Sequence, residues 1–187
     1  MSIRLAEYAG FCSGVRQAVE RALQESSRGA RVSTLGSLVH NEAVAEHLAR
    51  HGVAAVESPG EAAEGILLIR THGVAPAVLE EVERRKDLAI MDLTCPKVRR
   101  LQKLVGGLAE SGIQIIIYGD SRHPEVKGVI GWAGGEAEID IVSTVEELKE
   151  LTIKPSAALV AQTTGQSARY REIGECFQQR CPTGKVY

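Results

Sequence analysis

The sequence lacks both a strong charge bias and a long hydrophobic run. Its 22 Lys and Arg residues nearly balance 24 Asp and Glu residues, so the formal net charge is -2. Such a chain has no general basic field, and we expect no nucleic-acid partner. The longest apolar run, near IQIIIY, is far shorter than the roughly 20 residues that span a bilayer, and MSIRLAEYAG has no signal-peptide core. We therefore expect a soluble, cytoplasmic protein with no membrane partner.

A CxxC motif is also missing. The four cysteines stand at positions 12, 95, 176 and 181, without the CxxC or Cys-His pairs that are typical of zinc sites. Without a secretory signal the thiols should stay reduced, which favours metal ligation or catalysis over a disulfide framework. Arg16 follows Cys12 by only four residues, which argues against a phosphatase-type phosphate cradle.

The hydrophobic residues, 44% of the chain, form short runs that alternate with amphipathic stretches. This alternation predicts an α/β fold, with parallel-sheet units flanked by helices and strands buried on both faces. We divide the chain into a first unit, residues 1–95, which includes an N-terminal strand and the Cys12 loop, and a second unit, residues 96–187. The predicted strands are 65–70, 88–93, 113–119, 139–143 and 157–162, and the predicted helices are 16–27, 42–52, 76–86, 97–112 and 144–151.

Chemically reactive side chains recur where strands lead into helices. Cys12 and Cys95 occupy two such junctions, and a third carries the sequence Gln-Thr-Thr at 162–164. A second set of junctions carries His40, His72 and His123. Ligands of open α/β sheets bind beyond the carboxyl ends of the strands. One shared site is therefore expected to collect these residues.

Cys95 stands directly before Pro96, a residue that suits the first position of a helix. A helix N-terminus favours the thiolate form of a cysteine, and Cys12 in GFCSGVR has the same placement. Each cysteine alone is more simply interpreted as a small buried residue. Their paired placement instead indicates ligands or nucleophiles. Two distant cysteines suit an iron-sulfur cluster, although cluster ligation ordinarily uses more thiolates.

The histidines and one glutamate allow two interpretations each. His40, His72 and His123 are either ordinary loop residues or donors to phosphate oxygens in a polar pocket. Glu125 follows the third histidine and is either an exposed turn residue or a desolvated general acid. His47 and His51 have metal-pair spacing, but a solvated helix end is the favoured interpretation.

Six motifs in order give the chain a specific resemblance. GFCSGV, LVHN, THGV, DLTCPKV, HPEVKG and AQTT together resemble the LytB-type 4-hydroxy-3-methylbut-2-enyl diphosphate reductases of the non-mevalonate isoprenoid pathway. The resemblance implies a trefoil of three α/β units around a cavity, each giving one cysteine to a 4Fe-4S cluster with one iron not ligated by protein. It also implies reductive dehydroxylation of an allylic diphosphate to isopentenyl and dimethylallyl diphosphate, with an electron donor such as ferredoxin or flavodoxin.

Matching the motifs residue by residue implies roles for seven side chains. Cys12 and Cys95 would ligate the cluster, Glu125 would supply the proton, and the substrate would be bound by His40, His72, His123 and Thr163. The resemblance also implies a third unit with a third cysteine, which this chain does not contain. We expect structural roles for Cys176 and Cys181. The alternative to a reductase is a catalytically incomplete module that binds a diphosphate or a metal.

Overall fold

The computed structural model describes Arg4 and residues 10–187, which divide into two compact units. The first unit comprises residues up to Thr71 together with Arg85–Cys95, and the second comprises His72–Arg84 together with Pro96–Tyr187. The predicted N-terminal strand before Cys12 lies outside the described residues. No helix in the described part of the chain is long and apolar enough to cross a membrane.

The first unit is built on a four-stranded sheet in which every neighbouring pair is parallel. The strand order is β2-β1-β3-β4. The elements are α1 (Ser13–Ser27), β1 (Val32–Leu35), α2 (Glu42–Arg50), β2 (Val53–Val56), a short 3-10 helix η1 (Pro59–Glu61), β3 (Gly65–Ile69) and β4 (Leu88–Asp92). Strand β2 is absent from the sequence-based assignment because it is a four-residue edge strand with two exposed alanines, and so gives little hydrophobic pattern.

The second unit repeats this plan with the parallel order β6-β5-β7-β8. Its elements are α3 (Pro76–Arg84), α4 (Pro96–Glu110), β5 (Gln114–Tyr118), α5 (Pro124–Ala133), β6 (Ile139–Val142), α6 (Val145–Glu150), β7 (Ala157–Ala161), α7 (Ser167–Arg180) and β8 (Lys185–Val186). The α/β class predicted from the sequence is confirmed in both units.

Segment 72–84 packs with the second unit, whereas the sequence-based division at 95/96 placed it in the first. Its approach to α5 depends on small residues, since a side chain on Gly131 would lie 2.3 Å from the Cβ of Ala75. Trp132 adds a directed bond, because its Nε1 donates to the carbonyl of Val74 at 3.0 Å. Such contacts between distant segments leave no periodic signal in a sequence.

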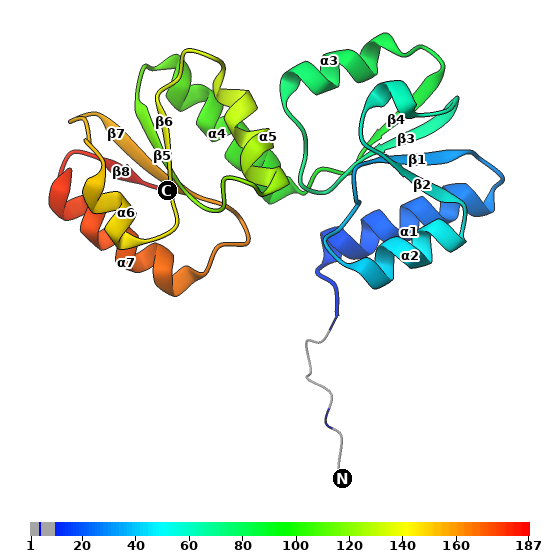
Figure 1. Ribbon diagram of the computed structural model, residues 1–187, viewed down its shortest axis with the longest axis horizontal. Coiled ribbons are helices and arrows are strands. Elements are labelled where there is room, and N and C mark those ends of the chain that lie inside the picture. The colour runs from blue at the N-terminus through cyan, green and yellow to red at the C-terminus, as the bar shows by residue number, and fades with distance from the viewer. Residues whose placement is uncertain (1–3, 5–9) are drawn as a thin grey trace. The chain divides into compact units, whose positions relative to one another are not determined.

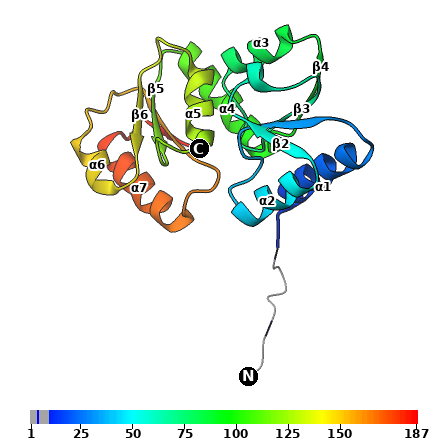
Figure 2. The ribbon, with the colours of Figure 1, turned by 45° about the vertical axis from the view of Figure 1, so that its right-hand side comes forward.

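Helices cover both faces of the second sheet, as Figures 1 and 2 show from two directions. Alternate residues of β5 point to opposite faces, as the pleat of a strand requires. Ile115 and Ile117 pack with α4 and α5, while Ile116 and Tyr118 pack with α6 and α7. Every residue of β5 is buried, which explains why only apolar residues and one tyrosine follow Gln114 in this strand.

In the first unit, α1 and α2 cover one face of the sheet (Figure 1). Ala18 and Ala22 of α1 are fully buried against this face, where small side chains let the helix approach closely. Leu67 and Ile69 of β3 point to the other face and are also buried. The central strand β3 is thus apolar on both sides, as the sequence predicted.

In both units an arginine at an equivalent position donates to two backbone carbonyls of a short helix end. Arg85 donates to the carbonyls of Pro59 and Ala62, at the end of η1. Arg180 donates to the carbonyls of Leu148 and Leu151, at the end of α6. The carbonyls of Pro59 and Leu148 also accept the amides of Ala62 and Leu151, so each guanidinium adds further bonds at the end of a short helix. The two units therefore share small details as well as strand order.

Two glycines provide a test of this fold. Gly65 has φ +146°, and a Cβ there would lie 2.3 Å from the carbonyl oxygen of Arg31. We expect Gly65→Ala to lower the free energy of unfolding by about 2 kcal/mol or more, through backbone strain and overlap. Gly107 is the matched control, since nothing lies within 4 Å of its added Cβ. In α4, Gly107→Ala should raise stability by about 0.5–1 kcal/mol. Urea unfolding followed by circular dichroism measures the free energy of unfolding of both variants. Equal changes in the two variants would contradict the close approach of Gly65 to Arg31.

Candidate functional site

The chain changes direction at the carboxyl edge of each sheet. In the first unit β1 lies between β2 and β3, and in the second unit β5 lies between β6 and β7. The connections from β1 and β3, or from β5 and β7, therefore leave toward opposite sides and open a crevice between the two strand ends. His40 follows β1, and Glu125 and Thr163 follow β5 and β7. The predicted residues thus lie where this topology places ligands.

The two predicted cysteine ligands lie at one edge of the first unit. Cys12 is the N-cap of α1, is exposed, and makes no capping hydrogen bond through its side chain. Cys95 is half-buried and directly precedes Pro96, the first residue of α4, as predicted. The Sγ atom of Cys95 lies 4.0 Å from the position of a Cβ added to Gly14. Its thiol therefore faces the first turn of the helix that Cys12 caps, and both thiols are free.

Thr71 connects the cysteine segment to the loop that carries His40. Its Oγ1 donates to the carbonyl of Leu38 at 3.2 Å, and its own carbonyl accepts from the amide of Cys95 at 2.9 Å. Thr71 is 6% exposed, so both bonds are shielded from water. This residue was not singled out by the sequence, because its role depends on two segments far away along the chain.

His40 is exposed on the loop between β1 and α2. Asn41 caps α2, accepting from the amide of Val44 at 3.1 Å, and so fixes the end of this loop. A cavity of about 330 Å³ adjoins it and is lined by Ser37, His40, Asn41, Glu42 and Ala45. His40 is therefore placed on a hollow large enough for a small anion.

Glu125 and Thr163 form the most directed contact at the edge of the second unit. The amide of Thr163 donates to Oε1 of Glu125 at 2.6 Å, and its hydroxyl donates to Oε2 at 2.8 Å. Glu125 is only 1% exposed, which excludes the interpretation as an exposed turn residue. Both carboxyl oxygens are thus fixed by a single residue from the neighbouring strand end.

His123 and His72 lie together in the second unit. His123 is the N-cap of α5, and its Nδ1 accepts from the amide of Glu125 at 3.1 Å. In the neutral ring, Nε2 then carries the proton and can donate to a ligand. The rings of His72 and His123 meet edge to face with centroids 5.4 Å apart. Two predicted phosphate donors are therefore neighbours.

Asp120 shapes the turn that leads to His123. Its Oδ1 accepts from the amide of Arg122 at 2.9 Å and from the Arg122 guanidinium at 3.3 Å. These bonds, the backbone bond first, hold the pKa of Asp120 below its usual value. Asp120 is thus a fixed carboxylate, and its carbonyl accepts from the amide of His123 at 2.9 Å. No role for Asp120 is predicted from the sequence.

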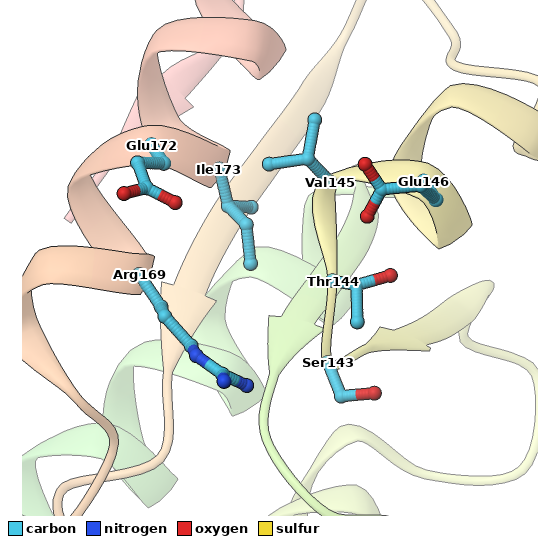
Figure 3. Close-up of a pocket in the computed structure, with 7 residues that line it drawn as sticks. All are labelled: Ser143, Thr144, Val145, Glu146, Arg169, Glu172 and Ile173. Carbon is cyan, nitrogen blue, oxygen red and sulfur yellow. The ribbon is translucent and has the colours of Figure 1, made fainter.

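A further cavity of about 300 Å³ lies in the second unit between α7 and the segment that enters α6 (Figure 3). Arg169 and Glu172 project from α7, opposite Ser143 and Thr144. None of the seven predicted site residues lines it. This cavity therefore shares no lining residue with the predicted site.

The remaining cysteines and histidines lie apart from these residues, and Cys176 is a half-buried residue of α7 that packs against the core. Cys181 is 3% exposed, and its Sγ contacts the carbonyls of Lys154 and Pro155 at 3.3 and 3.5 Å. His51 is the C-cap of α2, and its Nδ1 contacts the carbonyl of His47 at 2.7 Å. The helix-end interpretation of this histidine pair agrees with that position.

Comparison with known proteins identifies the family. A family model described as "LytB protein" matches residues 3–187. The chain belongs to the LytB family. Among similar proteins, the 4-hydroxy-3-methylbut-2-enyl diphosphate reductase of Geotalea daltonii is 38% identical over 173 residues, covering 92% of this chain and 60% of the relative. The reductase of the same name from Thermoanaerobacter sp. strain X514 is 39% identical over 183 residues, with 95% and 62% coverage.

Solved structures agree with this LytB assignment. The E-1-hydroxy-2-methyl-but-2-enyl-4-diphosphate reductase of Plasmodium falciparum superimposes with a TM-score of 0.86 at 26% identity, covering 97% of this chain and 57% of that one. A second structure, titled (E)-4-hydroxy-3-methyl-but-2-enyl diphosphate reductase, the terminal enzyme of the non-mevalonate pathway, gives a TM-score of 0.79 at 33% identity, with 99% and 66% coverage. The resemblance and the fold class are confirmed. The LytB chain spans about 60% of the length of the curated relatives.

The Thr71 hydroxyl should hold the His40 loop in place. We expect Thr71→Val, which keeps the side-chain volume but loses the bond to Leu38, to speed amide exchange in residues 36–41 by roughly fivefold, the equivalent of about 1 kcal/mol. Hydrogen-exchange mass spectrometry measures this rate. Thr71→Ser keeps the hydroxyl and is the control. Equal exchange of this loop in the wild type and in Thr71→Val would show that the bond does not hold it.

Proposed function

We propose that this LytB chain serves the reductive dehydroxylation of 4-hydroxy-3-methylbut-2-enyl diphosphate to isopentenyl and dimethylallyl diphosphate, the last step of the non-mevalonate isoprenoid pathway. The relatives bear the name of this activity, and the chain spans about 60% of their length. The buried Glu125–Thr163 pair carries the proposal, because a carboxyl group held by directed bonds at a strand end suits proton transfer to a bound substrate.

Cys12 and Cys95 are the proposed ligands of a 4Fe-4S cluster. Both are free thiols, and the Cys95 thiol faces the helix turn capped by Cys12. Thiolates are the protein ligands of such clusters, so this donor set fits the group. When bound, the cluster would supply electrons and an open iron that acts as a Lewis acid. An electron donor of the ferredoxin or flavodoxin class would reduce it.

Glu125 and Thr163 would handle the proton. Breaking the allylic C–O bond with two electrons and two protons gives the product and water, so the leaving oxygen must be protonated. A hydroxyl both donates and accepts, and the 2.8 Å contact between Thr163 Oγ1 and Glu125 Oε2 can therefore pass a proton in either direction. Glu125 would supply this proton, with Thr163 in contact with the substrate.

The three histidines would bind the diphosphate group. In His123 the bond from the Glu125 amide to Nδ1 leaves Nε2 as the donor, so a structural contact also sets the orientation toward a ligand. His72 lies beside this ring, and His40 lines the hollow in the first unit. Imidazole donors bind phosphate oxygens without a large basic surface, which agrees with the net charge of -2.

A binding module is the second candidate. The chain offers two cysteines at helix starts, whereas cluster ligation ordinarily uses more thiolates. Such a module would bind a diphosphate or a metal without reduction. A colourless protein, after anaerobic purification, that still binds an allylic diphosphate would favour it.

Cluster assembly is the first test. We expect the chain, reconstituted anaerobically with iron and sulfide, to become brown and to contain both elements in comparable amounts, because its thiols ligate iron. Cys95→Ser should lose this content, whereas Cys176→Ser, the matched control within α7, should keep it. Iron and sulfide analysis with a visible spectrum gives the result.

If the wild-type chain takes up no cluster, a chimera that adds the remaining C-terminal part of the Geotalea daltonii relative is reconstituted in the same way. A cluster in this chimera that depends on Cys95 supports the proposal. Colourless preparations of both proteins, or full content in Cys95→Ser, would refute the assignment of Cys95.

Proton supply is tested in the same chimera. Glu125→Gln keeps the shape of the side chain but removes the acid, so we expect turnover to fall at least about a hundredfold while iron content is unchanged. Glu110→Gln, on the exposed end of α4, should leave turnover intact. Anaerobic product formation with a chemical reductant measures the rates. Full activity of Glu125→Gln would remove Glu125 from the proton path.

A further inference from the structure

Gln162 uses both ends of its amide at the carboxyl edge of the second sheet. It directly follows β7 and is 9% exposed. Its Oε1 accepts from the amide of Asp120 at 3.1 Å, and its Nε2 donates to Oγ1 of Thr164 at 2.8 Å. A buried amide with both ends bonded has a single stable orientation.

These two bonds join the loops that carry the proposed proton donor and its partner. Asp120 lies on the loop from β5 to α5, and Glu125 is in the first turn of α5. Thr164 lies on the loop after β7, next to Thr163. Gln162 therefore connects the loop from β5 to α5 with the loop after β7. The distance between these two loops determines whether Thr163 reaches Glu125.

This connection depends on a glycine in the opposite loop. A Cβ on Gly119 would lie 2.9 Å from Oε1 of Gln162 and 3.1 Å from its Cβ. Gly119 therefore lets the amide lie directly against the loop from β5 to α5. The backbone amide of Gln162 also donates to the carbonyl of Tyr118 at 2.8 Å, which continues the ladder between β5 and β7.

The first unit has a different side chain at the equivalent place. Arg70 follows β3 as Gln162 follows β7, and its Nη1 would lie 2.3 Å from a Cβ on Gly36, which follows β1 as Gly119 follows β5. Burial lowers the pKa of Arg70 from its usual value, and Glu57 partly opposes this. The common scaffold therefore accepts a long side chain of either kind. In the second unit the side-chain amide of glutamine suits this place, because its oxygen accepts from a backbone amide and its nitrogen donates to a hydroxyl oxygen.

We propose that Gln162 is a positioning residue that fixes the distance between Thr163 and Glu125 and thereby the orientation of the Glu125 carboxyl. Gln162 acts through the two loops and needs no contact with a substrate. Its significance for catalysis rests on the proposed function, but its effect on the Thr163–Glu125 contact does not. The two statements can therefore fail separately.

The test uses the 187-residue chain labelled with nitrogen-15. The Thr163 amide, which donates to Glu125 at 2.6 Å, should resonate far downfield and exchange slowly with water. Gln162→Met keeps the length of the side chain but removes both bonds. We expect its Thr163 amide to move upfield and to exchange faster by on the order of tenfold. Thr164→Val removes one bond, and its effect should be intermediate.

Gln114→Met is the matched control in the same unit. Gln114 is 2% exposed and lies at the start of β5, the end opposite to Gly119. Its amide makes three bonds, to Asp140 at 2.8 Å, to the carbonyl of Thr152 at 3.0 Å and from the amide of Lys154 at 2.8 Å. This variant loses comparable hydrogen bonding, yet the Thr163 resonance should keep its position.

The outcomes separate positioning from general destabilisation. An unchanged Thr163 amide in Gln162→Met, or an equal change in Gln114→Met, would overturn the proposal. If Gln162→Met does not fold, Thr164→Val decides, because a Thr163 amide identical to the wild type would then overturn it. A changed Thr163 amide together with full turnover of Glu125→Gln would leave the positioning role intact and reject the proposed proton path.

Discussion

Burial of both faces of a parallel sheet is the constraint on which the site depends. Parallel strands all run in the same direction, so the carboxyl ends of all the strands in a unit lie at one edge of the sheet. Each face is closed by apolar contacts, as the alternation along β5 shows, with Ile115 and Ile117 packed on one side and Ile116 and Tyr118 on the other. The edge is then the place where polar groups can gather without disturbing the core.

The repeated plan of the two units shows how one scaffold holds different chemistry. Arg85 and Arg180 donate to equivalent carbonyls in the two units, and Gly36 and Gly119 follow equivalent strands. At the strand ends the side chains diverge. The first unit contributes thiols near the start of α1, and the second contributes a buried carboxyl that is held by a hydroxyl and an amide. The scaffold is thus constant where packing determines it and variable at the strand ends, where the proposed site residues lie.

Helix starts carry much of the polar geometry. Cys12 is the N-cap of α1, Asn41 caps α2 and His123 caps α5. The side chains of Asn41 and His123 accept an amide of the first turn, which gives each a defined direction, whereas the side chain of Cys12 makes no such bond. In His123 the same bond that starts the helix occupies Nδ1, so in the neutral ring the proton is on Nε2. The contact that caps the helix therefore also determines the tautomer of a proposed phosphate donor.

The sequence by itself determined the α/β class, most of the buried strands (β1 is missing from the predicted set) and the residues with reactive side chains, because hydrophobic period and residue type are local properties. It also carried the six ordered motifs that the LytB family match confirms. Only the tertiary structure decided that Glu125 is buried and bonded at both oxygens by Thr163, that Thr71 connects Leu38 to Cys95, and that segment 72–84 packs with the second unit. Gln162 stands beside a predicted residue, yet its two partners lie on different loops. Hydrogen bonds between distant segments depend on the packing of strands against each other, and the pattern of a single chain does not encode them locally.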